Sequence, residues 1–216
     1  MKTLIISDTH LYDAFDERKY IFLKNLFASV DAIVLNGDFW DAYRTSFDAF
    51  ISSPWNKLFP LLKAKKTIYL YGNHDQKRYS DNRTAFFSII QKENHIIMID
   101  GFEYQIEHGH MLQKSIDLAY PLPRKVWYYL SQIFQRLEHI LNIIGSPHQC
   151  ILQKQNKKIK EMLQAQKVKK GYICGHTHYA EVDIKNKFAN SGFVQFGKAS
   201  YLIVDTSGIS LRTNRY

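Results

Sequence analysis

Carboxylate, amide and imidazole side chains recur in five short clusters along this chain, and each cluster directly follows an apolar stretch. The clusters are Asp8-Thr9-His10, Gly37-Asp38-Phe39-Trp40-Asp41, Gly72-Asn73-His74-Asp75, His108-Gly109-His110 and Gly175-His176-Thr177-His178. Oxygen and imidazole ligands of this kind suit manganese, iron, zinc or magnesium, and the clusters offer no thiolate. Together they predict a site for divalent metal ions.

Two metal ions can share such a site when one carboxylate bridges them. Ions about 3.5–4 Å apart clamp the attacking and leaving oxygens of an in-line displacement, and they generate hydroxide from water near neutral pH. A lone Asp-x-His or Gly-Asp pair is more often just a turn after a strand, so the prediction depends on the whole set. The most specific cluster is Gly175-His176-Thr177-His178, because imidazoles two residues apart on an extended segment point the same way.

Strands must bring these clusters to one place. Short apolar runs at Thr3–Ser7, Ala32–Leu35 and Thr67–Tyr71 precede the first three clusters and predict buried strands. Helical spacing predicts a helix that ends at Ala28, with Asp16 as its N-cap. Strands that alternate with helices favour βαβ units, whose carboxyl ends converge on one crevice. The clusters can therefore meet at a single point.

The C-terminal part of the chain is richer in strands than the first half. Further helices are expected at Trp55–Ala64 and Asn82–Gln91, and further strands at His95–Ile99, Phe193–Phe196, Tyr201–Asp205 and Ile209–Arg212. A hairpin turn at Thr206-Ser207-Gly208 joins the last two strands. A βα first half followed by a β-rich end predicts an α/β fold of two packed sheets flanked by helices, in a single domain over residues 1–216.

The ordered set D-x-H, G-D-x-x-D, G-N-H-D, H-G-H and G-H-x-H resembles the calcineurin-like metallophosphoesterases. The motifs span nearly the whole chain outside an insertion at about residues 111–170. The resemblance implies an αββα sandwich of two mixed sheets. It also implies a phosphoesterase that hydrolyses a phosphodiester or pyrophosphate bond with a metal-activated water. Two divalent ions are expected, manganese foremost, with iron, zinc or magnesium as alternatives.

The same resemblance implies a role for each motif residue. Asp8, His10 and His178 would hold the first metal, Asp38 would bridge, and Asn73, His108 and His176 would hold the second. His74 resembles the catalytic histidine beside the leaving group, and Asp41 its carboxylate partner. This pairing is chemically reasonable, because a carboxylate raises the pKa of a histidine and fixes the tautomer that donates a proton. His110 is expected to support the ligands.

Ala42 distinguishes the chain from one branch of this family. Many phosphoprotein phosphatases have arginine directly after the position of Asp41, where Ala42 stands here. A protein phosphatase is therefore disfavoured. His95, His139 and His148 lie outside the motifs and are expected at the surface or in ordinary packing contacts.

Residues 111–170 contain no strand-like segment and predict helices. Apolar residues from Val126 to Ile144 recur at helical spacing, while Gln132 and Arg136 exclude a membrane span. The next helix is rich in lysine. Two interpretations remain: a helical hairpin packed on the sandwich, or an apolar lid with basic flanks for a lipid-bearing anionic substrate at a membrane surface.

An insertion at this place is similar to that of the UDP-diacylglucosamine pyrophosphohydrolases of lipid A synthesis. That resemblance implies a nucleotide-linked glycolipid as substrate. Those enzymes usually have arginine where His74 stands and H-G-D in place of His108-Gly109-His110. The alternatives are a nuclease or cyclic-nucleotide phosphodiesterase, and a non-catalytic scaffold of the same fold. The short chain leaves little room for DNA-binding segments, and scaffold members tend to lose the histidine retained here as His74.

The composition of the chain bears on its possible ligands and on its cellular compartment. The net charge of +9 fits an anionic substrate, a nucleic acid, an anionic membrane or simple solubility. Cys150 and Cys174 form no CxxC pair, which favours a reduced, intracellular compartment. The apolar run Thr3–Ile6 is too short for a signal peptide or a membrane span. We therefore expect a cytoplasmic protein, peripheral to the membrane if the insertion is a lipid-binding lid.

Overall fold

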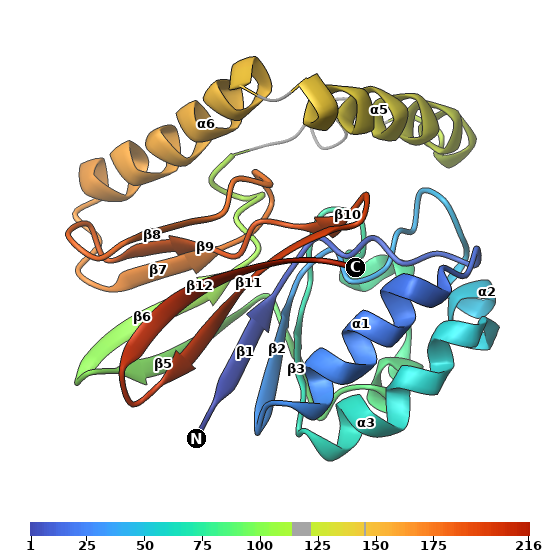
Figure 1. The fold of residues 1–216 in the computed structure, drawn as a ribbon, viewed down its shortest axis with the longest axis horizontal. Helices are drawn as coiled ribbons and strands as arrows, with labels where there is room; N and C mark the ends of the chain where they lie inside the picture. The colour runs from blue at the N-terminus through green and yellow to red at the C-terminus, as the bar shows by residue number, and fades with distance from the viewer. Residues whose placement is uncertain (114–121, 145) are drawn as a thin grey trace.

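The computed structural model describes residues 1–113, 122–144 and 146–216, and within them two β-sheets face one another (Figure 1). The first sheet has the order β10-β11-β1-β2-β3-β4, with β12 paired to β11. Its strands are β1 (Thr3–Ile6), β2 (Ala32–Asn36), β3 (Ile68–Leu70), β4 (Ile90–Lys92), β10 (Val194–Gln195), β11 (Lys198–Asp205) and β12 (Gly208–Arg215). The first four strands along the chain run parallel, and β11 runs antiparallel to β1.

The second sheet has the order β5-β6-β7-β9-β8. Its strands are β5 (Asn94–Ile99), β6 (Phe102–Glu107), β7 (Gly171–Cys174), β8 (Glu181–Asp183) and β9 (Phe188–Asn190). Here β6, β7 and β9 are parallel neighbours, while β5 and β8 pair antiparallel at the two edges. Both sheets are therefore mixed, which confirms the predicted fold class.

Helices cover the outer faces of the two sheets. The first sheet is covered by α1 (Glu17–Ala28), α2 (Phe47–Ser52) and α3 (Phe59–Ala64), with short 3₁₀ helices at η1 (Pro54–Leu58), η2 (Lys77–Tyr79) and η3 (Asn82–Phe86). The insertion forms α5 (Arg124–Ile144) and α6 (Ser146–Ala165). None of the helices described is long and apolar enough to cross a membrane.

The apolar core has one part on each face of the first sheet. Alternate residues of each strand point to opposite faces. Thus Leu4 packs toward α1 with Leu23 and Phe27, whereas Ile5 packs between the sheets with Ile106 and others. Helix α1 begins where predicted, because the Asp16 side chain accepts a hydrogen bond from the Lys19 backbone N–H at 3.1 Å.

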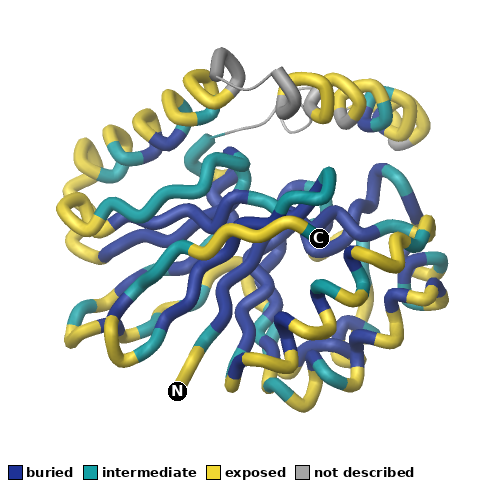
Figure 2. The backbone as a smooth tube through the Cα atoms, viewed as in Figure 1, coloured by how far each residue is buried: buried dark blue, intermediate teal, exposed yellow. Residues whose placement is uncertain are grey.

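The outermost layer on the second sheet comes from the insertion itself. Ile159 of α6 is fully buried against Tyr172, Cys174 and Phe188 of β7 and β9. Helix α5 instead extends across one end of the sandwich, the end at which β1 terminates (Figure 1). Most of the surface of α5 is exposed (Figure 2). The two insertion helices therefore have different structural roles.

The prediction of a helix over Asn82–Gln91 is wrong. The chain forms only the 3₁₀ helix η3, in which Asp81 accepts a hydrogen bond from the Arg83 backbone N–H at 2.9 Å. It then turns at the fully buried Phe87 and continues as β4, which pairs parallel with β3. Burial of Phe87 and strand pairing thus override the local helical pattern.

Candidate functional site

All five polar clusters follow strands whose carboxyl ends meet at one edge of the sandwich, after β1, β2 and β3 of one sheet and β6 and β7 of the other. Backbone hydrogen bonds connect the clusters to one another. The His10 N–H donates to the Asp38 carbonyl at 2.9 Å, and the Gly175 N–H donates to the His108 carbonyl at 3.0 Å. Each sheet thus carries part of one site.

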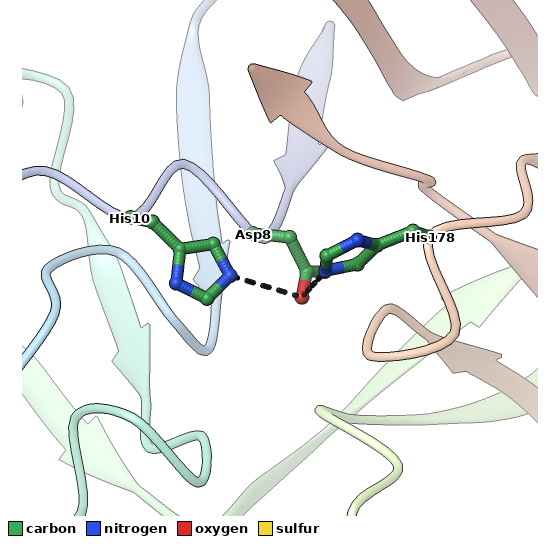
Figure 3. A group of neighbouring side chains, drawn as sticks. All are labelled: Asp8, His10 and His178. Atoms are coloured by element: carbon green, nitrogen blue, oxygen red, sulfur yellow. Dashed lines mark ion pairs between the residues drawn. The ribbon is translucent and has the colours of Figure 1, made fainter. Parts of the chain in front are cut away.

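Asp8, His10 and His178 form the first group able to hold a metal ion (Figure 3). The Asp8 Oδ1 atom lies 3.2 Å from His178 Nε2 and 3.9 Å from His10 Nε2. The two imidazoles approach this oxygen from opposite sides (Figure 3). The three ligand atoms lie within 4.8 Å of one another, as binding to one ion requires.

Asp8, Asp38 and His108 form a second group, so Asp8 belongs to both. His108 Nε2 lies 3.2 Å from Asp38 Oδ2 and 3.1 Å from Asn73 Oδ1. The other ring nitrogen, Nδ1, donates to the Asn36 carbonyl at 2.9 Å and thereby directs Nε2 into the group. Metal-binding histidines commonly have such a carbonyl partner.

Asp41 connects two histidines in a third group. Its Oδ1 lies 3.1 Å from His74 Nδ1, and its Oδ2 lies 3.4 Å from His10 Nδ1. Burial opposes ionisation, but His74 and His10 outweigh it and hold the pKa of Asp41 below its usual value. His74 is the more exposed histidine of the pair, at 23% of its side chain, so a substrate can reach it.

Two buried atoms indicate that a cation fits among these side chains. Asp8 Oδ1 and His10 Nε2 have no hydrogen-bond partner among the described residues, and such atoms are costly in a folded protein. Burial alone would lower the pKa of His108, but Asp38 and Asp8 raise it to about 9. A proton therefore occupies a position where a metal ion would also be favoured, and the donor set suits hard or borderline divalent ions.

His176 lies beside these groups rather than within one of them. Its Nε2 donates to the Gln113 carbonyl at 2.9 Å, and its ring centroid lies 5.1 Å from that of His108. Burial and the neighbouring His108 lower the pKa of His176 to about 3, which keeps the imidazole neutral as a metal ligand must be. The ring of His110 lies 5.5 Å from that of His108.

The backbone of the candidate ligands is strained. Five of these residues have positive φ, in the left-handed region that residues other than glycine rarely adopt: Asp8, His10, Asp38, His176 and His178. Strain of this kind concentrates at functional sites. Close packing adds a second constraint, because a Cβ on Gly37 would lie 2.5 Å from the His108 ring and one on Gly72 only 2.2 Å from Asp38 Oδ1.

Asp75 belongs to the third cluster but had no role assigned from the sequence. Its buried carboxylate accepts hydrogen bonds from the backbone N–H groups of Asp38 at 3.0 Å, Phe39 at 2.8 Å and Gly72 at 2.6 Å. Burial and the nearby Asp38 raise the pKa of Asp75 to about 7. Asp75 thus fixes the second cluster against the third.

Asn156 of α6 was not recognised in the sequence, where it stands among lysines and resembles a surface residue. It is fully buried. Its Nδ2 donates to the Tyr179 carbonyl at 3.0 Å and to Glu181 Oε2 at 2.9 Å, and its Oδ1 accepts from Thr177 Oγ1 at 2.6 Å. Thr177 lies between two candidate ligands, so Asn156 fixes the loop that carries them.

Helix α5 also reaches the site, through aromatic contacts. The buried Trp127 stacks on Tyr43 with ring centroids 5.7 Å apart. Tyr43 in turn meets His74 edge to face, with ring centroids 4.8 Å apart.

The histidines outside the motifs lie away from the metal groups where they are described. His139, expected at the surface, is exposed and lies against Phe196, and His95 is half-buried on β5. The His148 side chain is outside the described set.

Comparisons with known proteins agree with this geometry. A sequence model of the family described as calcineurin-like phosphoesterase matches residues 1–180. No curated protein matches the chain. Similar solved structures include wild-type Vps29 of Entamoeba histolytica complexed with Zn²⁺, at 15% identity and a TM-score of 0.50 over 100% of this chain and 98% of that one. An archaeal phosphodiesterase is 21% identical, with a TM-score of 0.51 over 100% of both chains. At these identities the likeness shows the fold alone.

Replacing Asn156 with alanine should weaken metal binding. The change leaves Thr177 Oγ1 and Glu181 without this partner, and loss of buried hydrogen bonds costs about 1–3 kcal/mol of unfolding free energy. We expect a lower affinity for Mn²⁺ by calorimetry and a lower melting midpoint. The control is Lys157→Ala, at an exposed position of the same helix. Equal Mn²⁺ affinity in both variants and the unmodified protein would contradict this role of Asn156.

Proposed function

The chain belongs to the calcineurin-like phosphoesterase family, and from this membership and its site we propose that it hydrolyses a phosphodiester or pyrophosphate bond with two divalent metal ions. The observation that carries the proposal is the buried Asp8 carboxylate. Its Oδ1 has no hydrogen-bond partner among the described residues, and two potential ligand groups meet at this residue, one with His10 and His178 and one with Asp38 and His108. Two adjacent ligand groups are what a pair of neighbouring cations requires.

We assign the ligands from these groups and from the position of Asp38, whose Oδ2 lies 3.7 Å from His10 Nε2 and 3.2 Å from His108 Nε2. Asp8, His10 and His178 would bind one ion; Asp38 would bridge; Asn73, His108 and His176 would bind the other. The distances within each group support this assignment. His176 would have to turn its Nε2 from the Gln113 carbonyl toward the ion. Manganese is our first choice of metal, with iron, zinc and magnesium as alternatives.

Bound divalent ions supply a nucleophile near neutral pH and stabilise negative charge on phosphate oxygens. His74 would donate the proton to the leaving oxygen. Because Asp41 accepts the proton of His74 Nδ1 at 3.1 Å, Nε2 is the nitrogen directed at the substrate. Asp41 would keep His74 in this tautomer and favour its protonated form.

For the substrate, we propose a lipid-linked anionic molecule such as a UDP-diacylglucosamine. Supporting this, the apolar stripe of α5 is exposed: Ile133, Phe134, Leu137 and Ile140 each expose about half of their surface. A hairpin packed on the sandwich would bury them, so that alternative does not fit these side chains. Lysine and arginine outnumber acidic residues in the insertion, which would favour an anionic membrane surface.

A nucleic-acid or cyclic-nucleotide phosphodiesterase would use the same ligands but would gain nothing from the exposed stripe. A non-catalytic scaffold would not require His74 and Asp41 to remain paired beside the metal groups. Screening the manganese-loaded protein against an aryl phosphodiester, an aryl phosphomonoester and UDP-sugar lipids separates these functions. Absence of hydrolysis on all three would favour the scaffold.

Removing the metal should abolish hydrolysis of an aryl phosphodiester, and Mn²⁺ should restore it. We expect two Mn²⁺ per chain, with loss of one or both in Asp38→Ala. Because the metal-free His108 has a pKa of about 9, it is protonated at pH 7 and must lose this proton when it binds metal. Calorimetry in buffers of different ionisation enthalpy measures that release. Full activity of the chelated protein would refute the proposal.

His74→Ala should retain both metals and reduce kcat by roughly 10²–10⁴-fold, the usual contribution of a positioned acid–base group. Asp41→Asn should cause a smaller loss, because the imidazole remains but its tautomer is no longer fixed. Metal content and kcat are measured on the same preparations. His95→Ala, a histidine on β5 outside the motifs, serves as control. An unchanged kcat in His74→Ala with both metals bound would exclude the proposed proton transfer.

Phe134→Glu should selectively weaken hydrolysis of a lipid-linked substrate. Phe134 is 46% exposed, so a carboxylate there stays hydrated and the melting midpoint should hardly move. Hydrolysis of a small soluble diester should be unchanged, because the metal groups lie on the sandwich. Gln132→Glu places the same charge two residues away on another side of α5. Equal loss on both substrates together with a lowered midpoint would instead indicate packing.

A further inference from the structure

A cavity of about 290 Å³ opens beside the first candidate metal group, between the loop after β1, the start of α1 and the turn that joins β10 to β11. We call it the aromatic pocket, because the residues that line it include Tyr12, Phe15, Trp55 and Phe196. Its volume lies at the lower end of the range for small-molecule sites. Aromatic side chains of this kind bind a flat ring by stacking.

Lys19 gives the aromatic pocket a buried hydrogen-bond donor. It belongs to the first turn of α1, lines the pocket and exposes only 7% of its surface. An ammonium group has three protons to donate, and among the described residues the acceptor shown for that of Lys19 is the Thr9 carbonyl. The negative charge of Asp16, which also lines the pocket, partly compensates this cation. A neutral carbonyl oxygen of a ligand would accept a further charge-assisted hydrogen bond from Lys19.

Specific contacts hold the aromatic walls in place. The Trp55 indole N–H donates to the Tyr12 carbonyl at 2.8 Å, and the Phe15 ring meets the Trp55 ring edge to face with centroids 4.9 Å apart. Phe196 stands in the turn after β10 with a φ of 56°, in the left-handed region that a bulky residue seldom adopts. Backbone strain of this kind clusters at active sites and ligand clamps. The turn thus keeps the Phe196 ring at the pocket at a cost in backbone strain.

The aromatic pocket adjoins the candidate metal site through His10. This residue lines the pocket, while its Nε2 lies 3.9 Å from Asp8 Oδ1 and 3.7 Å from Asp38 Oδ2. The His10 ring also meets the ring of His74, the proposed proton donor, edge to face with centroids 4.6 Å apart. A molecule with a phosphate at Asp8 and Asp38 could therefore extend past His10 and place a ring in the pocket.

We propose that the aromatic pocket binds the base of a nucleotide-linked substrate, with a ring carbonyl accepting from Lys19, while the phosphate that is attacked lies at the metal groups. This inference rests on the proposed phosphoesterase function and narrows its substrate class. Bases with a ring carbonyl, such as uracil and thymine, suit both the aromatic walls and the buried donor. An acyl chain would gain nothing from the ammonium group, and an inorganic anion would gain nothing from the rings.

The test compares two ligands that share a phosphate and differ in the base. Uridine 5′-monophosphate and ribose 5-phosphate are titrated by calorimetry into the manganese-loaded, full-length protein. Stacking on aromatic side chains and a hydrogen bond from an ammonium group each contribute roughly tenfold in affinity, so the nucleotide should bind about 100-fold more tightly. In Lys19→Met and in Phe196→Gly this ratio of affinities should fall to about tenfold, because each variant loses one of the two contacts.

Two features of the design separate the pocket from its surroundings. Lys19→Met also removes the donor to the Thr9 carbonyl, so a change common to both ligands reports on the metal groups and only the ratio reports on the pocket. Phe196→Gly keeps Lys19 and relieves the positive φ, so its melting midpoint should stay close to that of the unmodified protein. The matched controls are Lys24→Met, at an exposed position of α1, and Lys66→Gly, at an exposed position with a φ of 53°. Both controls should keep the full ratio.

A ratio that falls in both pocket variants and in neither control supports base binding in the aromatic pocket. A ratio near one in the unmodified protein, or a ratio that either pocket variant leaves unchanged, overturns it. The 4-nitrophenyl ester of thymidine 5′-monophosphate tests the proposed function separately. If this ester is not hydrolysed while the ratios behave as expected, the hydrolase proposal fails and the base site stands. If the ester is hydrolysed while the ratio is near one, the base site fails and the hydrolase proposal stands.

Discussion

The structure depends on burying carboxylates close to one another. Asp8, Asp38, Asp41 and Asp75 are all nearly or fully excluded from solvent at one edge of the sandwich. Buried ionised groups are tolerated only when opposite charge or hydrogen bonds compensate them. Asp75 has three backbone N–H donors, and Asp41 has two imidazoles. Asp8 Oδ1 accepts no hydrogen bond from a described residue, but it lies 3.2 Å from His178 Nε2 and 3.9 Å from His108 Nε2. A divalent cation held between Asp8 and these imidazoles would add the full positive charge that a neutral imidazole lacks.

The requirement for compensation explains why two sheets are needed. The first sheet supplies the carboxylates after β1 and β2, and the second supplies His108 and His178 after β6 and β7. The shared core between the sheets, which includes Ile5 and Ile106, sets the distance between these halves. Substitutions in this core would therefore change the ligand geometry as well as stability, because densely packed interiors transmit strain.

The sequence contains enough information for most of the fold and for the residues that gather at its edge. Apolar runs before polar clusters are local signals, and the strands at β1, β2 and β3 lie where those signals predict. The features that the sequence missed depend on tertiary structure. The strand at β4 requires pairing with β3, and the burial of Asn156 requires α6 to dock on β7 and β9.

Helices α5 and α6 contact the site in different ways, and this difference bears on how a substrate is recognised. Helix α6 is held by Asn156 and by Lys160, which bonds to Glu181 at 2.6 Å and to Asp183 at 2.8 Å. It therefore acts as a fixed support for the loop of His176 and His178. Helix α5 contacts the site through Trp127 and Tyr43, next to His74, and leaves its apolar stripe exposed. A ligand bound along α5 would consequently act near His74, whereas the candidate metal ligands would stay in place.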